Sequence, residues 1–512
     1  MILRDGKKTS LWQNAVEPYA PEKIIKKNVL YDVLIAGGGI TGITTGLLLQ
    51  EAGFNCIIVE AKNLCFGTTG GTTAHLNTLL DTTYPQMIKN FGKEKTIQVA
   101  NGVKEAIALV RANIMQYEID CSFSEANAYL FSQNEEQTKE LEDILERSLE
   151  VGVEVASANS LELNIPFNKI LRAVSQAKFN PVRYVYTLAK EFEKKGGQIL
   201  INSRVTDVDN NDVVTITTTN GIFKAKNLIY ATHIPPTVNL VHLRCAPYRS
   251  YATAFQLKKG GYPKELYYDM YDPYHYYRSQ EIDGTQYMIV GGYDHKTGQE
   301  ENTEKPFLEL KAHCRKYFNV DQFEYEWSSQ YFEPADGLPY IGHLPGQQDN
   351  IFVATGFGGN GMVYSHVAAV LLTNMLTGVD DPLIEVLNPN RIKPVAGFTN
   401  FIKHNAGVVK NFAEKLFSHE DLDELADVAT GEGRLVDYEK QKMALYKDEA
   451  GMYHALSPSC THLGCEVKWN AAECSWDCPC HGARYDVDGD VLTGPADRQL
   501  KKIEIQDTVK HS

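Results

Sequence analysis

The sequence predicts a multidomain protein in which an α/β domain carries an inserted antiparallel sheet and is followed by a small all-β domain. Three observations predict this arrangement. Residues 31–60 read as strand, glycine turn, apolar helix and strand. Residues 245–295 show strand patterns dense in tyrosine, and from about residue 426 short strands and turns carry a cluster of cysteines. A chain of 512 residues is also too long for a single core.

Composition narrows the class of protein. Hydrophobic residues make up 43% and charged residues 22%, as in an ordinary globular protein. The formal net charge of −15 argues against a nucleic-acid partner and gives no attraction to anionic lipid. The first ten residues have no apolar stretch of the secretory kind, and no apolar run reaches the ~18 residues of a membrane span. We therefore expect a cytoplasmic protein without a transmembrane segment.

We expect a polar arm over residues 1–30. A glycine turn follows the first strand after this arm. Gly37, Gly39 and Gly42 form G-x-G-x-x-G between strand and helix, and Glu60 ends the next strand. Gly37 permits the tight turn, Gly39 lets the backbone approach a pyrophosphate, and Gly42 allows close packing of helix and strand. Glu60 can accept hydrogen bonds from ribose hydroxyls. This context predicts a dinucleotide site, although the motif does not separate FAD from NAD.

The middle of the chain alternates helices and strands. Helical periodicity covers residues 94–116 and 134–152, and strand patterns cover 163–180 and 245–295. A second glycine pattern, in ATGFGGNGMVYS (354–365), again lies between a strand and an apolar helix. No acidic residue ends a following strand at the needed distance, so we expect one dinucleotide and no separate NAD domain.

Several segments resemble the D-amino-acid-oxidase-like (DAO) family of FAD-dependent oxidoreductases. The loop GTTGGTTAHLNT (67–78) resembles that family's phosphate-binding loop, and the resemblance continues through residues 179–209, 226–233, 333–342 and 354–365. It implies one FAD, with residue 205 by the adenine and the helix after the second glycine pattern aimed at the flavin. The implied FAD contacts are Gly37, Gly39, Ile40, Thr41, Gly42, Glu60, Ala61, Thr72, Thr73, Ala74, His75, Val205, Gly358, Gly359, Asn360, Gly361 and Met362.

The resemblance leaves the substrate open. The family oxidises amines, amino acids or 2-hydroxy acids by hydride transfer to FAD, and members that hold a carboxylate often use a cation near one of the glycine motifs. In this chain the loop after the first glycine motif has no arginine, and the position two residues beyond the last glycine of the second motif is Val363. Arg249 or Arg278 could substitute for the missing cation. The stretch YYDMYDPYHYYRS (267–279) either packs the sheet or forms an aromatic wall for a cationic amine. His75 either is a hydrogen-bonded loop residue or contacts the flavin, covalently or not.

The cysteine cluster forms two boxes, Cys460-x-His462 and Cys478-x-x-His481. A structural zinc site could use these four residues. The boxes and the segment around them, 475–496, resemble the Rieske [2Fe-2S] domain. The resemblance implies that Cys460 and Cys478 bind the inner iron and that His462 and His481 bind the outer iron. It also implies a disulfide between Cys465 and Cys480. For Cys474 we expect a spare thiol.

Two residues near the boxes bear on the reduction potential. High-potential Rieske proteins have a serine where this chain has Ala483, and that hydroxyl bonds a bridging sulfur. Tyr485, placed to bond a cysteine sulfur, is retained. Hydrogen bonds to the sulfurs stabilise the reduced cluster, so we expect a potential in the middle or lower part of the roughly −150 to +300 mV span of Rieske centres.

The fold that we expect is an α/β FAD-binding domain, Rossmann-like and of the glutathione-reductase type, with an inserted antiparallel-sheet substrate domain and a C-terminal all-β Rieske domain. The FAD-binding part covers residues 31–119, 181–244 and 330–378. The substrate part covers 120–180 and 245–329. A linker with an amphipathic helix over 398–417 covers 379–425, and the Rieske part covers 426–512.

The two cofactors together predict a dehydrogenase. It would pass electrons from a small-molecule substrate to FAD and then singly through the cluster to an external one-electron acceptor, a ferredoxin-like protein or a quinone, with exposed cluster histidines as the exit. Two alternatives remain: a reductase in which electrons enter through the cluster, and a redox sensor or electron-transfer module without turnover. A pocket between the tyrosine-rich sheet and the flavin would count against the last.

Overall fold

The computed structural model describes residues 4–22, 25–26, 28–391, 420–422 and 425–505. The amphipathic helix predicted over 398–417 lies outside the described residues. Within these ranges, no helix has both the length and the apolar character that a bilayer crossing requires.

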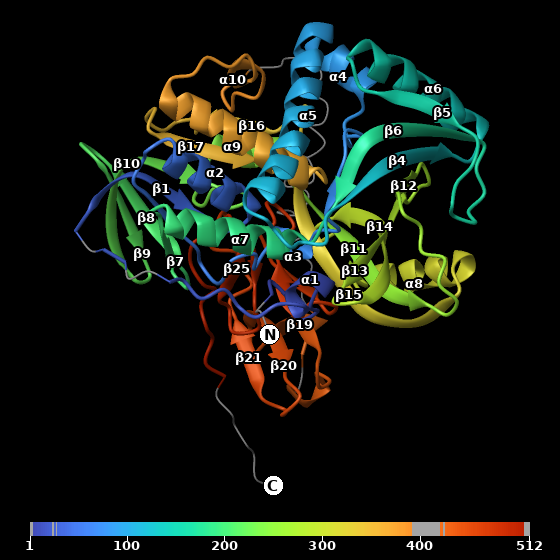
Figure 1. Ribbon diagram of the computed structural model, residues 1–512. Coiled ribbons are helices and arrows are strands. Elements are labelled where there is room, and N and C mark those ends of the chain that lie inside the picture. Colours follow the sequence, from blue (N-terminus) through green and yellow to red (C-terminus); the bar gives the residue numbers. More distant parts are fainter. Residues whose placement is uncertain (1–3, 23–24, 27, 392–419, 423–424, 506–512) are drawn as a thin grey trace.

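The α/β domain is built on an eight-stranded sheet (Figure 1). Its strands β1 (Leu30–Ala36), β2 (Cys56–Val59), β7 (Gln198–Leu200), β10 (Gly221–Tyr230) and β17 (Ile351–Thr355) are parallel in the order β17-β10-β1-β2-β7. Antiparallel β16 (Tyr340–His343), β8 (Val205–Asn210) and β9 (Val214–Thr218) complete the sheet. Helix α2 (Ile40–Glu51) packs on α7 (Pro181–Lys194) and α9 (Gly361–Thr377), and α5 (Lys93–Gln116) packs on α9. The predicted α/β fold is confirmed.

A nine-stranded sheet forms the second layer of the molecule. Its order is β15-β11-β14-β13-β12-β4-β6-β3, with β5 on β6. The strands are β3 (His75–Leu76), β4 (Ser124–Ser132), β5 (Val155–Ala158), β6 (Lys169–Lys178), β11 (Cys245–Leu257), β12 (Leu266–Asp269), β13 (His275–Ile282), β14 (Thr285–Lys296) and β15 (Val320–Pro334). All pairs are antiparallel except β12 with β4. Helices α6 (Glu135–Glu150) and α8 (Lys305–Tyr317) pack on it.

Two boundaries of the substrate part differ from the expected ones. Strand β15 continues past residue 330, because Pro334 still pairs with Cys245 of β11. The short strand β3 lies in the range expected for the FAD-binding part, yet His75 pairs with Lys178 of β6. The loop after the first βαβ unit therefore ends in the second sheet, and it connects the dinucleotide turn directly to the inserted layer.

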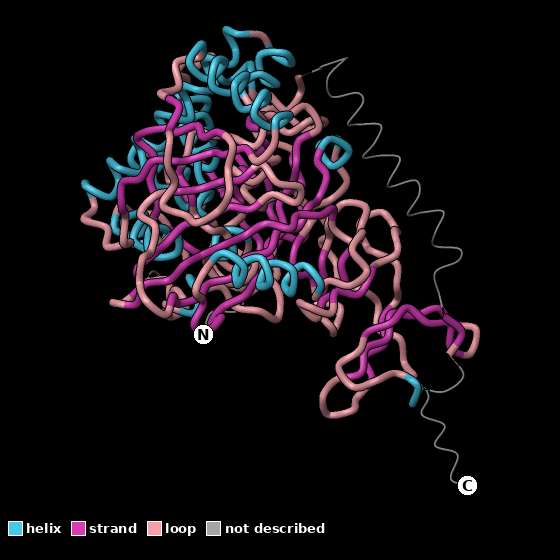
Figure 2. Tube along the Cα trace, turned by 90° about the vertical axis from the view of Figure 1, so that its right-hand side faces the viewer, coloured by secondary structure: helices cyan, strands magenta, loops and turns pink. Residues whose placement is uncertain are grey.

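The C-terminal part contains two four-stranded sheets. The first runs β18 (Glu420–Asp421), β19 (Gly433–Tyr438), β20 (Gln441–Lys447) and β21 (Tyr453–Leu456). The second, which carries the cysteine boxes, runs β22 (Lys468–Asn470), β23 (Ser475–Asp477), β24 (Arg484–Tyr485) and β25 (Val491–Thr493). Figures 1 and 2 show the first sheet projecting away from the body of the molecule. The cysteine-bearing sheet lies nearer the body, where Arg204 Nη2 donates to the carbonyl of Val491 at 2.7 Å.

The N-terminal arm is not the polar surface segment that we expected. Leu11 and Trp12 of the short helix α1 (Leu11–Asn14) are 1% and 0% exposed, and Arg4 and Asp5 are also buried. The indole of Trp12 donates to the carbonyl of Thr72 at 2.5 Å. This part of the arm is buried because Trp12 bonds the loop after β2 and because Arg4 and Asp5 pair with the C-terminal domain.

Candidate functional site

One cavity runs from the glycine turn after β1 to the tyrosines of the nine-stranded sheet. Most of the residues that the resemblance implied for FAD line it. They are Gly37, Gly39, Ile40, Thr41, Glu60, Ala61, Thr72, Thr73, His75, Val205, Gly358, Gly359, Asn360, Gly361 and Met362. Gly42 and Ala74 do not line the cavity. The cavity therefore brings together three stretches of sequence that are far apart in the chain.

The glycine turn has the open backbone that a dinucleotide needs. Gly37 has φ +114°, which side-chain-bearing residues rarely adopt, and a Cβ there would lie 2.4 Å from the carbonyl oxygen of Ala231. A Cβ on Gly42 would lie 2.0 Å from the carbonyl oxygen of Gly37. Gly39 caps the twelve-residue helix α2 with no side-chain hydrogen bond, and Gly39, Ile40 and Thr41 line the cavity, so the N-terminus of α2 lies at its wall. These features fit the pyrophosphate of FAD.

The loop that follows β2 is held by groups from three directions. Trp12 donates to Thr72, Trp327 donates from its indole to the carbonyl of Gly71 at 2.7 Å, and Arg278 donates to the carbonyls of Thr73 and Ala74 at 2.8 and 2.6 Å. This fixes the backbone of the loop along the wall of the cavity.

One end of the cavity suits the adenosine half of FAD. Glu60 lines it and accepts from the N–H groups of Gly38 at 2.7 Å and Lys62 at 2.8 Å. Burial raises the pKa of Glu60, although these hydrogen bonds oppose the shift. Val205 and Arg204 lie here too, and the C-terminal domain contributes residues 492–494 and 496–497 to the same wall. The cysteine-bearing domain thus helps to form the cavity of the α/β domain.

The opposite end of the cavity is aromatic and acidic. Tyr268, Tyr274, Tyr276 and Tyr331 line it together with two carboxylates, Asp81 and Asp294. Tyr274 and Tyr331 each donate a hydroxyl hydrogen bond to Asp294 Oδ2, at 3.1 and 3.0 Å. Burial raises the pKa of Asp294 to about 6. Sequence reasoning missed both carboxylates. The only signal for Asp294 was an acidic residue following an apolar strand and two glycines, in YMIVGGYDH.

His75 lines the cavity between these two regions. The distance from its Nδ1 to the Tyr268 hydroxyl is 2.6 Å, and its Nε2 is buried with no hydrogen-bond partner. Burial, and then the charges of Arg278 and Lys178, lower its pKa well below the usual value. The imidazole is therefore neutral at ordinary pH.

The two arginines considered as carboxylate-binding groups do not line the cavity. Arg278 holds the loop carbonyls, as described above. Arg249 donates to the hydroxyl of Ser328 at 2.6 Å and approaches Asp477 Oδ2 at 3.4 Å. The lining of the cavity therefore gives no support to either arginine as a substitute for the missing cation, although Nε and Nη2 of Arg278 are buried with no hydrogen-bond partner.

The four expected metal ligands come together on two adjacent loops. The rings of His462 and His481 have centroids 5.0 Å apart, and all four of their nitrogens are buried with no hydrogen-bond partner. The thiol of Cys478 lowers the pKa of Cys460 to about 7. Two adjacent thiols and two imidazoles with free nitrogens fit a [2Fe-2S] cluster.

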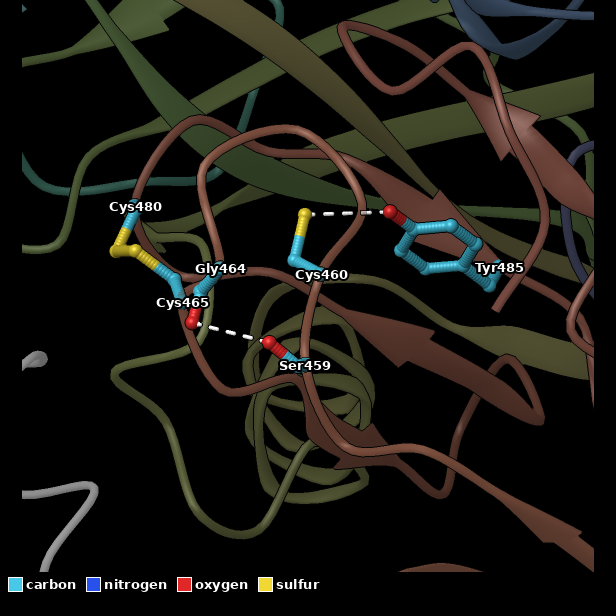
Figure 3. Close-up of a disulfide and its surroundings, with 6 residues drawn as sticks. All are labelled: Ser459, Cys460, Gly464, Cys465, Cys480 and Tyr485. Atoms are coloured by element: carbon cyan, nitrogen blue, oxygen red, sulfur yellow. Dashed lines mark hydrogen bonds between the residues drawn. A yellow bond between two sulfur atoms is a disulfide. The ribbon is translucent and has the colours of Figure 1, made fainter. Parts of the chain in front are cut away.

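Two further sulfurs lie beside these ligands. Cys465 and Cys480 form a disulfide that joins the two loops (Figure 3). Their sulfurs lie within 4.8 Å of Cys478 Sγ, but neither is a thiolate while they are bonded to each other. The Cys474 thiol is partly exposed and lies outside this group.

The disulfide gives a direct prediction. Cys480→Ser is expected to lower the free energy of unfolding by about 3 kcal/mol, because the bond closes a loop of about fifteen residues. Cys474→Ser, which removes a thiol in the same domain, is the control and should leave stability unchanged. In the unfolded, metal-free protein without reductant, eight of the ten cysteines should react as thiols. Reaction of all ten would contradict the pairing.

Tyr485 contacts the ligand loop directly. Its hydroxyl lies 3.2 Å from Cys460 Sγ (Figure 3), and the N–H of Thr461 donates to it at 3.1 Å. Ala483 is fully buried, and it offers no hydroxyl at the position where high-potential Rieske proteins have a serine.

We expect opposite shifts of the potential from two substitutions. Tyr485→Phe removes a hydrogen bond to sulfur and should lower the midpoint potential, and Ala483→Ser should raise it. Each shift should be about 60 mV, which corresponds to about a tenfold change in the equilibrium constant for one-electron reduction. A redox titration followed by EPR measures both. Unchanged midpoints in the two variants, or shifts of the same sign, would contradict this role of hydrogen bonding.

The cluster histidines are less exposed than we predicted. His481 is 3% exposed, and only His462 is partly accessible. The ring of His242, in the 3-10 helix η1 (Leu240–Arg244), lies 4.8 Å from His462 and 6.2 Å from His481. Burial, and then His462, lower the pKa of His242 to about 3. The expectation of two exposed histidines is wrong, because His481 is buried.

A single side chain connects the cavity to the ligand loops. Gln330 of β15 lines the cavity, and its Nε2 donates to the carbonyl of Gly482 at 2.8 Å. Gly482 directly follows His481. Thr297 donates to Gln330 Oε1 at 3.1 Å and so fixes the amide. Nothing in the sequence marked Gln330, since its partner lies in another domain.

A buried network of charges holds the C-terminal domain in place. Glu473 accepts from Arg4 at 3.0 Å and from the hydroxyl of Ser328 at 2.6 Å. Arg484 pairs with Asp477 at 3.0 Å and with Asp5 at 3.1 Å. Burial alone would raise the pKa of Glu473, but the neighbouring arginines overcome it and lower the pKa to about 2. The network joins the N-terminal arm, the nine-stranded sheet and the cysteine-bearing domain.

Comparisons with known proteins agree with this division. Residues 32–375 match the model of the family described as FAD dependent oxidoreductase (DAO), and residues 420–504 match the Rieske [2Fe-2S] domain. The chain is 31% identical to YhfW of Bacillus subtilis (strain 168), described as a Rieske 2Fe-2S iron-sulfur protein, over 93% of each chain.

Two further similarities cover about 70% of the chain. The chain is 22% identical to gamma-glutamylputrescine oxidoreductase of Escherichia coli (strain K12), over 72% of this chain and 89% of that protein. Among solved structures, glycine oxidase from Geobacillus kaustophilus covers 71% of this chain and 99% of its own, with a TM-score of 0.60 and 16% identity. The fold and the two cofactors predicted from sequence are thereby confirmed.

Proposed function

The chain belongs to the DAO family of FAD-dependent oxidoreductases and carries a Rieske [2Fe-2S] domain, and from this premise we propose that it is a dehydrogenase with a one-electron outlet. A small amine, amino acid or 2-hydroxy acid would be oxidised in the cavity, and the electrons would leave singly through the Rieske domain to an external acceptor. When bound, FAD takes up two electrons as a hydride and the cluster takes up one, so the pair links a two-electron donor to a one-electron acceptor.

The contact through Gln330 carries this proposal. One side chain lines the cavity and also bonds the residue that follows His481. In addition, the buried charges of Glu473 and Arg484 fix the C-terminal domain against the nine-stranded sheet. The two cofactor sites therefore have a fixed relation, which suits repeated electron transfer between them.

The aromatic and acidic end of the cavity favours an enzyme over a sensor. A pocket lined by Tyr268, Tyr276 and Asp294 lies beyond the loop residues implied for FAD. Such a pocket gives a small molecule a place to bind next to the flavin. The name of the relative that acts on gamma-glutamylputrescine supports an amine among the possible substrates.

The proposal assigns roles to the ligands and to the outlet. Cys460 and Cys478 would hold the inner iron, and His462 and His481 the outer iron. His462 is the more accessible of the two histidines, and the neighbouring Leu463 is 40% exposed. The external partner, a ferredoxin-like protein or a quinone, would therefore approach on the side of His462.

A comparison of two histidine variants tests the outlet. Purified protein is mixed anaerobically with a panel of amines, amino acids and 2-hydroxy acids, while flavin absorbance and reduction of a one-electron acceptor such as cytochrome c are followed. His462→Ala should still show flavin bleaching but should reduce the acceptor at least tenfold more slowly. His454→Ala is the control, because His454 bonds Asp488 at the surface of the same domain.

Two outcomes would contradict the proposal. If His462→Ala reduces the acceptor as fast as the wild type, electrons leave the flavin without the cluster. If no compound bleaches the flavin in protein that holds both cofactors, the chain is not a dehydrogenase for these substrate classes.

A further inference from the structure

Two carboxylates lie at the tyrosine-lined end of the cavity, which no Arg or Lys lines among the residues that the structure describes. Asp81 and Asp294 both line this end, and neither forms an ion pair within the described ranges. Burial raises the pKa of both carboxyl groups. A buried carboxylate without a positive partner is costly, so this end of the cavity attracts a cation.

Asp294 is held rigidly but only partly satisfied. Tyr274 and Tyr331 both donate to Oδ2, which leaves Oδ1 buried with no hydrogen-bond partner. Tyr274, which directly precedes β13, and Tyr331 of β15 thus fix the carboxylate in one orientation. A bound ammonium group would supply the positive charge that no ion pair among the described residues supplies.

A substrate carboxylate finds no arginine or lysine in the lining of this end, within the part of the chain that the structure describes. Arg204 is the one Arg or Lys that lines the cavity, counting the residues that the structure describes, and it lies with Glu60 at the adenosine end. His75 is neutral. A substrate carboxylate would therefore meet Asp81 and Asp294 without any compensating cation, and like charges repel strongly in a cavity of low dielectric.

The aromatic rings add attraction for a cation. The hydroxyls of Tyr268 and Tyr276 are committed to wall contacts, with Asn77 Nδ2 at 2.6 Å and with the hydroxyl of Ser250 at 2.8 Å. The rings of His75 and Tyr276 pack edge to face, with centroids 5.7 Å apart. The walls are thus fixed aromatic surfaces, and the face of a tyrosine ring attracts an ammonium group.

We propose that this end of the cavity is a cation subsite that selects amines lacking an α-carboxylate, with the Asp294 carboxylate as the counter-charge of the substrate ammonium. The inference rests on the proposed function, since it names the substrate class of the same cavity. Of the three proposed substrate classes, the subsite would accept amines and exclude amino acids and 2-hydroxy acids.

Two probes of equal ring size and opposite charge test the subsite without turnover. Benzyltrimethylammonium and benzoate are titrated into the FAD-loaded protein, and binding is read from the perturbation of the flavin absorbance spectrum. We expect the cation to bind and benzoate not to bind. Binding of benzoate alone, or of neither probe, overturns the proposal.

The matched variants are Asp294→Asn and Glu281→Gln. Asparagine keeps an oxygen for Tyr274 and Tyr331 to bond but removes the charge, so the Kd of the cation should rise at least tenfold. Glu281 is an exposed residue of β13, and its variant should bind the cation like the wild type. An unchanged Kd in Asp294→Asn, with FAD content retained, overturns the role of Asp294.

The pH dependence gives an independent readout. Because the Asp294 carboxyl is neutral below its pKa of about 6, cation binding to the wild type should weaken as pH falls through this value. Burial also raises the pKa values of Asp81, which lines the same end, and of Glu333, which interacts electrostatically with Asp294, and both lose charge in the same direction. The part due to Asp294 is the difference between wild type and Asp294→Asn. Equal pH profiles would overturn its assignment as counter-charge.

A turnover assay distinguishes failure of the cation subsite from failure of the proposed dehydrogenase function. Phenethylamine and phenylalanine differ by one carboxylate, and only the amine should bleach the flavin. Bleaching by phenylalanine alone overturns the subsite and keeps the dehydrogenase. Cation binding without bleaching by any compound contradicts the dehydrogenase and keeps the subsite.

Discussion

Replacing Arg484 with methionine is expected to lower the free energy of unfolding by about 3–5 kcal/mol, because it leaves buried carboxylates without their positive partner. Arg484 is completely buried and bonds Asp477 and Asp5, which belong to opposite ends of the chain. Methionine fills much of the volume of the arginine stem but supplies no charge. The N-terminal arm and the Rieske domain should then separate more readily from the nine-stranded sheet.

Arg498→Met is the control for this experiment. Its guanidinium is 79% exposed and forms a surface pair with Asp497, so its removal should cost less than about 1 kcal/mol. Chemical denaturation followed by circular dichroism, together with limited proteolysis of the N-terminal arm, measures the difference. Equal stability of the two variants would show that the buried network does not hold the domains together.

Gly42→Ala is expected to yield protein that has lost most of its FAD. The added Cβ would lie 2.0 Å from the carbonyl oxygen of Gly37, and a backbone atom in a tight turn cannot move away as a side-chain tip can. Overpacking typically costs about 1–3 kcal/mol, and a backbone contact puts this variant at the upper end of that range. The ratio of flavin to protein absorbance in the purified variant measures the loss.

Gly46→Ala, one turn further along the same helix, is the matched control. Its Cβ would meet the terminal methyl of Ile58 at 2.8 Å, and that methyl group can rotate aside. Alanine is also the better helix former. This variant should retain its FAD, and loss of flavin from both variants to the same extent would mean that helix packing in general, rather than the turn at Gly37, controls binding.

The features that the sequence predicts well are local ones. The turn around Gly37 and the two ligand boxes are visible because each needs particular residue types at fixed short spacings. The same holds for the tyrosine-rich strands, whose composition was clear even though their role remained open. Only the structure shows which residues contact these tyrosines.

The features that the sequence did not predict depend on contacts between distant residues. Arg4 looked like part of a polar arm because its partner, Glu473, lies 469 positions away. Gln330 and Asp294 are single polar residues within strands, with no motif around them. Their roles follow from what the other domain or the cavity places opposite them, and no local pattern contains that information.

The distance along the chain between Arg4 and Glu473 also sets an order of assembly. At about 5–20 residues per second, roughly 25 to 95 s of synthesis separate the two residues. During that interval Arg4 and Asp5 can pair with each other, but Glu473 and Arg484 have not been synthesised. These early charges thus complete their pairing, and the N-terminal arm docks, only after the Rieske domain has emerged and folded.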